Sequence, residues 1–337
     1  MLASVPGHVD LRPGCAPRHG LTDERSPNWV RLPLWLAQAW AGRRTGRRAG
    51  TALAEVLWSQ LALFLCVRLQ DDLLDGQRDD LRLLFVADRF LLESLEGFQR
   101  VHALDGGFWA FYRDCIRDTV EGILEVKRIE KRAGDFTTRH LGLHARASAV
   151  LKVGAAAVSR LYGHAGDGPW LSRLQDQLAI CGQIHDDLHD LIADLRDGRF
   201  TWVANVLLAA RPGESHSPPE WARRLDEGLM RPEREAVIVD ELRRVARAAA
   251  AEVPDSAPEP IHDLVRELSA EPDEIERSMH EARVRRVFGE AMRAGSSGGT
   301  RCLQAAGERR IERSCRSPRF RPVRDGAAPR STSRSPH

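Results

Sequence analysis

Two short acidic clusters, each following an apolar stretch, contain the residues of this chain with the clearest chemistry. Both have the spacing i, i+1, i+4, which places the carboxylates together on one face of a helix. The first Asp cluster is Asp71, Asp72 and Asp75 in QDDLLDG, and the second Asp cluster is Asp186, Asp187 and Asp190 in IHDDLHD. Because carboxylates this close repel one another, the repeated pattern indicates a shared cation.

Mg²⁺ suits such a pattern because it prefers hard oxygen ligands and binds one or two carboxylates together with phosphate oxygens of a substrate. Two clusters facing each other predict a clamp that holds a diphosphate on several Mg²⁺ ions and stabilises the charge on departing pyrophosphate. A solvated helix end would explain one cluster alone. It explains the pair poorly, since an unpaired charge at the end of an apolar stretch is costly.

The elements that must position these clusters are helices, because apolar residues recur at three- and four-residue spacing from Asn28 onward and no alternating strand pattern occurs. Gly- and Pro-containing breaks separate the segments. We expect helices at 28–42, 51–75, 79–104, 107–133, 137–163, 168–195, 199–210, 219–229, 231–252 and 258–292. The predicted fold class is all-α, a large helical bundle that encloses a central cavity.

Composition places the expected domain boundaries. The chain has 337 residues with a net charge of +2, but 294–337 carries ten Arg and three acids, hence +7, which leaves about −5 for the rest. We expect a disordered segment at 1–25, one domain at 26–293 and a disordered Arg-rich tail at 294–337. A solvated tail is favoured over one that binds nucleic acid or lipid, so no specific nucleic-acid partner is expected.

The cellular location is expected to be cytoplasmic. The six cysteines are scattered without a CxxC pair, which argues against a disulfide framework or a zinc ribbon. The N-terminal residues show no signal-peptide pattern. The stretch from Thr51 to Leu69 is long enough to span a bilayer, but Glu55, Gln60 and Arg68 indicate a helix buried in protein, so no transmembrane segment is expected.

The motifs resemble those of the trans-isoprenyl diphosphate synthases, the polyprenyl synthetase family of class I isoprenoid enzymes. QDDLLD matches the first Asp-rich motif of that family, and GQIHDDLHD matches the second, including Gln183. DLRDGRFT resembles the following DL-x-x-GK-x-T segment, with Arg199 where a Lys is usual. The resemblance runs from about Asn28 to Arg293. It implies the isoprenoid synthase fold, several Mg²⁺ ions held by both Asp clusters, ionisation of an allylic prenyl diphosphate, and a homodimer.

Several family features are absent. The segment that helps to bind isopentenyl diphosphate is reduced to NWVRLP, the paired Arg after the first motif become Arg78 and Arg82, and a middle-helix Lys-Thr pair becomes Arg146-Ala147. The insertion after the second motif is missing. These losses weaken the site for a second diphosphate. We therefore expect terpene-synthase-like chemistry on one substrate, with chain elongation by a geranylgeranyl-type synthase that adds isopentenyl diphosphate as the alternative.

Four further residues are expected to bind the substrate diphosphate or to orient the site. Gln183 would orient the second Asp cluster, and Arg199, with Arg146 and Arg68, would take up charge as pyrophosphate leaves. For Arg68, an i, i+4 salt bridge to the first Asp cluster is an equal alternative.

Two other classes of function were considered. His185 and His189 could ligate a metal, as in HD-type phosphohydrolases, but that reading leaves the first Asp cluster unexplained. A non-catalytic regulatory subunit of a prenyl synthase is the second class. It is disfavoured because such subunits tend to lose the aspartates, whereas all six are present here.

Overall fold

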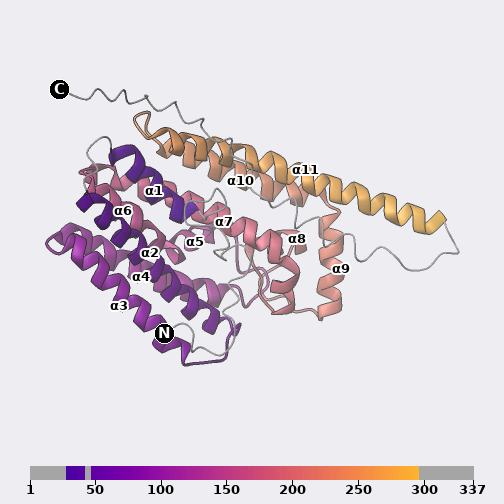
Figure 1. Ribbon diagram of the computed structural model, residues 1–337. Coiled ribbons are helices and arrows are strands. Elements are labelled where there is room, and N and C mark those ends of the chain that lie inside the picture. Colours follow the sequence, from indigo (N-terminus) through magenta and orange to yellow (C-terminus); the bar gives the residue numbers. More distant parts are fainter. Residues whose placement is uncertain (1–27, 42–46, 296–337) are drawn as a thin grey trace, which may run out of the picture. The chain divides into compact units, whose positions relative to one another are not determined.

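The computed structural model describes residues 28–41 and 47–295, which are helical with no strand among them (Figure 1). The all-α prediction is confirmed for these residues. Segment 1–25 and the residues after Gly295 lie outside the described part. The α-helices are α1 (Asn28–Ala41), α2 (Arg47–Leu74), α3 (Leu83–His102), α4 (Gly106–Ile129), α5 (Gly142–Ala147), α6 (Lys152–Leu161), α7 (Gly168–Arg196), α8 (Trp202–Leu208), α9 (Pro218–Leu229), α10 (Pro232–Glu252) and α11 (Glu259–Gly295).

The helix predicted at 137–163 is wrong as a single element. Short 3₁₀ turns at Thr138–His140 and Ala149–Leu151 interrupt it, and the two halves are bent by 49°. The break has a side-chain cause. The Val150 amide donates to the Thr119 hydroxyl at 3.0 Å, and the Val150 carbonyl accepts from Gln60 Nε2 at 3.2 Å. The Val150 amide and carbonyl thus bond to side chains of α4 and α2, and they do not take part in a regular series of helical hydrogen bonds.

Gly122 lets α4 and α5 approach each other closely beside this break. A Cβ at Gly122 would lie 2.4 Å from the backbone nitrogen of Ala147, a contact that real Cβ atoms do not make. The absence of a side chain at this position therefore brings α4 against α5 and α6. This packing fixes α4, whose last turn contributes Lys127 to the site described below.

The two Asp clusters lie on α2 and α7, and these helices pack against largely different neighbours. Helix α2 packs along α3 and also contacts α6, whereas α7 packs against α5, α6, α8 and α10 (Figure 1). Helix α7 is held from within the core because Trp170, Leu171, Leu174 and Ile184 on its inner face are buried. These contacts orient the second Asp cluster.

One stretch of α2, Gly50–Leu74, is long and apolar enough to cross a membrane by length and composition alone, and 33% of its most apolar window is buried. Among the described residues, the bent pair at 138–161 passes the same test only as one broken span. Helix α2 also buries Ser59 and Gln60, whose side chains donate to the carbonyls of Glu55 and Val150. Polar groups buried in protein usually find such partners, although Gln60 Oε1 has none. The expected absence of a transmembrane segment stays a prediction.

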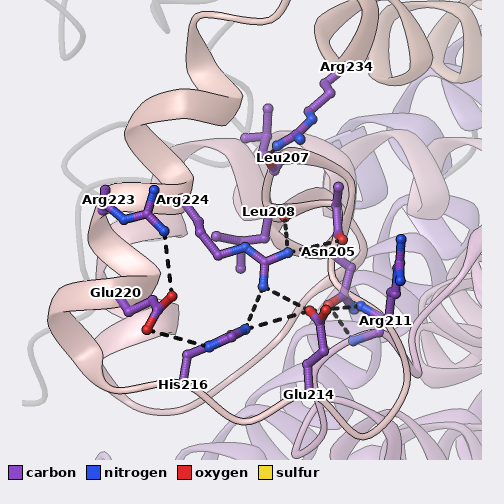
Figure 2. A network of polar contacts seen from close by, with 12 residues as sticks. Asn205, Leu207, Leu208, Arg211, Glu214, His216, Glu220, Arg223, Arg224 and Arg234 are labelled. Carbon is purple, nitrogen blue, oxygen red and sulfur yellow. Dashed lines mark hydrogen bonds and ion pairs between the residues drawn. The ribbon is translucent and has the colours of Figure 1, made fainter.

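A polar network holds the loop that follows α8, as Figure 2 shows. Ala209 ends α8 in the left-handed conformation, with φ of 46°, and leaves carbonyls without helical partners. Arg224 of α9 donates to the carbonyls of Leu208 at 3.0 Å and Ala209 at 3.3 Å, and to Glu214 Oε2 at 2.8 Å. Because α8 directly follows the DLRDGRFT segment, this network helps to fix the chain beyond Arg199.

Candidate functional site

The first Asp cluster lies at the carboxyl end of α2. The Asp75 amide still donates to the Asp71 carbonyl at 2.9 Å, and Gly76 then ends the helix with φ of +65°. A helix carboxyl end carries partial negative charge, which disfavours nearby carboxylates. The cluster therefore depends on cations brought by other side chains.

Lys127 of α4 supplies one of these cations. Its Nζ lies 2.5 Å from Asp75 Oδ1 and 3.3 Å from Asp71 Oδ1. Burial alone would lower the pKa of Lys127, but the charges of Asp71 and Asp75 outweigh it, and the pKa is raised. Lys127 is thus a charged, partly buried ammonium group beside the first Asp cluster.

Arg68 supplies another cation from within α2. Its Nε lies 3.0 Å from Asp72 Oδ1, and its Nη1 lies 3.9 Å from Asp71 Oδ2. The i, i+4 salt bridge considered from the sequence is therefore present. Binding of diphosphate by Arg68 stays a prediction.

The second Asp cluster lies within α7 and is divided by its surroundings. Asp187 is buried, with 1% of its surface exposed, and Gln183 Nε2 donates to Asp187 Oδ1 at 2.9 Å. Burial, reinforced by the charge of Asp194, raises the pKa of Asp187 to about 7. Asp186 and Asp190 are exposed, and His189 Nδ1 lies 3.1 Å from Asp190 Oδ1. Gln183 thus contacts the buried carboxylate of this cluster, and its role in orienting a substrate site stays a prediction.

Arg199 joins the ends of α2 and α7. Gly198 turns the chain back with φ of +73°, so that the Arg199 amide donates to the Asp194 carbonyl at 2.8 Å. Arg199 Nη2 then lies 2.7 Å from Asp194 Oδ1, and Nη1 lies 3.5 Å from Asp75 Oδ2. The protein packed around the Asp186 carboxyl group raises its pKa although the residue reaches solvent, and the Arg68 charge opposes this increase. The two clusters are therefore within electrostatic reach of each other.

Glu130 is a further charged side chain near Lys127 and Asp187. The sequence did not indicate Glu130, Lys127 or the ion pair of Asp194. The Glu130 carboxyl is buried, and burial raises its pKa to about 8, with Lys127 opposing and Asp187 contributing. The Glu130 carbonyl accepts from the Phe200 amide at 2.7 Å. The sequence offers no signal that separates Lys127 from its neighbour Arg128, which is exposed and pairs with Glu125.

Arg146 is placed differently from the other predicted residues. It donates to Glu121 and lies 3.9 Å from Asp118, both on α4. These contacts pair Arg146 along the outer part of α4 instead of with either Asp cluster. Its predicted role in binding diphosphate gains no geometric support.

The carboxylates of the two Asp clusters suit a hard divalent cation. They offer oxygen ligands, and some of these oxygens have no hydrogen-bond donor. Asp72 Oδ1 and Asp187 Oδ2 are buried without an aligned hydrogen-bond donor, although Arg68 and Thr201 lie beside them. No three of the six carboxylates offer oxygens that all lie within 4.8 Å of one another. Among the described residues, only Cys181, His185 and Glu271 bring three potential ligand atoms this close together. One or two carboxylates for each ion is the usual supply for Mg²⁺.

The predicted central cavity is not confirmed. Two open hollows, of about 640 Å³ and about 470 Å³, are lined by residues 100–106 and by residues in the range 226–232. Neither includes a residue of the two Asp clusters. Lys127 and Arg199 both lie against carboxylates of the first Asp cluster, so cationic side chains already occupy part of the space beside it.

No protein-family model matches this chain, and a search of curated proteins finds no match. The resemblance to the isoprenyl diphosphate synthases therefore rests on the sequence motifs quoted above. The motifs concerned span 70–75, 182–190 and 194–201.

Proposed function

We propose that this chain is a Mg²⁺-dependent class I isoprenoid enzyme with the isoprenoid synthase fold. It would ionise an allylic prenyl diphosphate and release pyrophosphate. The observation that carries the proposal is the placement of Arg199 between Asp75 at the end of α2 and Asp194 on α7. The last residue of the first Asp cluster and Asp194, which lies one turn beyond the second Asp cluster on α7, thereby share one guanidinium, an arrangement that would suit a diphosphate clamp.

In this proposal the two Asp clusters hold the Mg²⁺ ions, which neutralise the diphosphate and the departing pyrophosphate. Lys127 and Arg199 are paired with carboxylates in the structure, and both can donate to phosphate oxygens once those carboxylates are otherwise neutralised. Gln183 holds Asp187 in a fixed rotamer. The packed apolar faces of α2 and α7 would keep water away from the carbocation.

Chemistry on one substrate is favoured over elongation because the basic residues expected at a second diphosphate site are engaged elsewhere. Arg82 donates to both oxygens of Asp80, at 2.8 and 2.7 Å. Arg146 pairs with Glu121, and the Arg31 guanidinium lies 4.3 Å from the centre of the Trp35 ring. A terpene-synthase-like reaction needs none of these residues to bind isopentenyl diphosphate.

Product analysis tests the proposal. The full-length protein is incubated with Mg²⁺ and prenyl diphosphates of increasing length, each with and without isopentenyl diphosphate. A hydrocarbon or alcohol formed from one allylic diphosphate alone is the expected result. A longer diphosphate formed only with isopentenyl diphosphate would replace this reading with elongation. Absence of turnover by this chain under every condition would contradict the enzymatic proposal. The measurement is repeated with an active synthase added, and only turnover beyond that of the synthase alone is counted.

A further inference from the structure

Three potential metal ligands of different chemistry meet outside the Asp clusters. Cys181 and His185 lie one turn apart on α7, and Glu271 lies on α11. The three offer Sγ, a ring nitrogen and a carboxylate oxygen that all lie within 4.8 Å of one another. We propose that Cys181, His185 and Glu271 form a zinc site that fastens α11 to α7.

Two separations among the ligand atoms are of the size that tetrahedral zinc requires, each measured to a different oxygen of Glu271. With usual Zn–N, Zn–O and Zn–S lengths, tetrahedral angles place N and O about 3.4 Å apart, and S and O about 3.6 Å apart. In the structure, His185 Nε2 lies 3.3 Å from Glu271 Oε1, and Cys181 Sγ lies 3.7 Å from Glu271 Oε2. Rotation of the carboxylate is enough to present one oxygen to an ion held by the other two ligands.

An unmet hydrogen bond supports the same reading independently. His185 Nε2 is buried and has no hydrogen-bond partner, even though Glu271 Oε1 is close by. The pair therefore has the separation of a contact but not the alignment of a hydrogen bond. A metal ion between the two atoms would use the lone pair on the nitrogen and the charge on the oxygen.

The choice of zinc follows from the donor set. A thiolate with an imidazole suits a borderline-soft ion, whereas Mg²⁺ prefers oxygen ligands. Binding would release the thiol proton of Cys181 to solvent, and a water molecule would fill the fourth position. His189, which the sequence pattern would pair with His185, lies beside Asp190 and takes no part in this group.

The location suits a structural clip. Pro272 follows Glu271 inside α11, and a proline there removes one helical hydrogen bond and weakens that turn. Fixing Glu271 to two residues of α7 would stabilise α11 where its own backbone supports it least.

Zinc binding by the full-length chain tests the proposal. After gel filtration, metal analysis is expected to give one Zn²⁺ per chain, competed by a chelator of known affinity. Co²⁺ used as a probe is expected to show a thiolate charge-transfer band. Glu271→Gln, which keeps the shape of the side chain, and His185→Ala are each expected to weaken zinc binding at least tenfold, and Cys181→Ser is expected to abolish the cobalt band.

Matched controls separate this site from other cysteines, histidines and acids. Cys115→Ser removes a buried cysteine of α4, His189→Ala removes the histidine one turn farther along α7, and Asp71→Asn alters the first Asp cluster. All three are expected to bind zinc as the unaltered chain does, and circular dichroism checks that every variant is folded. The proposal is overturned if the unaltered chain binds no zinc, or if folded Glu271→Gln and His185→Ala variants keep its affinity and cobalt spectrum.

Discussion

The two Asp clusters share a spacing but lie in different surroundings. The first lies at a helix end, where Lys127, Arg68 and Arg199 bring three positive side chains to its carboxylates. The second lies within α7, where Asp187 is buried against Gln183 while its two companions face solvent. The same pattern of residues therefore gives two different clusters. Protein cations neutralise the first cluster, whereas burial raises the pKa of Asp187 in the second.

The difference shows what a metal would have to displace in each place. At the first cluster an ion must compete with Lys127 and Arg199, which then become available to phosphate oxygens. At the second cluster an ion must displace a proton from Asp187, whose pKa burial raises to about 7. The two clusters are thus expected to respond differently to substitution and to pH, even if they serve one reaction.

The largest effect is expected when either cluster loses a carboxylate. Asp71→Ala and Asp186→Ala should each lower turnover at least ~100-fold, the scale on which loss of a charge-stabilising group acts. Pyrophosphate release with the allylic substrate identified by product analysis measures the loss, and circular dichroism checks the helices.

Asp79→Ala is the matched control, because Asp79 is an exposed acid just beyond the first cluster. It should retain nearly full turnover. Full activity in Asp71→Ala or in Asp186→Ala would rule out the metal clamp.

The next effect concerns the cation shared by the first cluster. Lys127→Ala leaves Asp71 and Asp75 without their closest partner, so in EDTA it should lower the free energy of unfolding by about 1–3 kcal/mol. Added Mg²⁺ should recover part of this loss, because the ion replaces the missing charge. Urea denaturation with and without Mg²⁺ measures both quantities.

Arg128→Ala is the neighbouring control on α4. Arg128 is exposed and forms a surface ion pair with Glu125, so its loss should cost less stability than the loss of Lys127. Equal losses in the two variants would show that Lys127 has no special place beside the first cluster.

A further effect, which depends on pH, is expected from Glu130. Burial raises its pKa from 4.5 to about 8, so between these pH values the folded chain binds more protons at Glu130 than the unfolded chain. Stability should therefore fall as pH rises through this window, by up to ~1.4 kcal/mol per pH unit. Glu130→Gln removes this contribution and should be increasingly more stable than the unaltered chain toward pH 8.

Urea denaturation in EDTA at several pH values measures the slope. Glu125→Gln, on the same helix, is the control, because the hydrogen bond from Arg128 lowers the pKa of Glu125 and gives it the opposite sign. An unchanged slope in Glu130→Gln would show that this carboxyl is not the source.

The sequence predicted most of the helical elements, whereas it did not indicate the cations around the two Asp clusters. Periodicity locates α2 and α7, since it depends on neighbours three and four residues away. Lys127, Glu130 and Glu271 become important only through contacts made by other helices, and no local pattern marks them. The break at Val150 was missed for the same reason, because side chains of α2 and α4 produce it.

The smallest effect is expected from Arg82, and it sharpens the choice between one substrate and two. Arg82 is exposed and is held by Asp80, two residues away, in a surface ion pair of the kind that contributes little to stability. Arg82→Ala should therefore change turnover of the allylic substrate less than ~2-fold, since a reaction with one diphosphate does not use this guanidinium. If isopentenyl diphosphate is a co-substrate bound by Arg82, the same variant would instead raise its KM at least ~10-fold, the scale of one lost charged hydrogen bond. Steady-state kinetics with each substrate varied in turn distinguishes the two outcomes, and a selective rise in that KM would favour elongation.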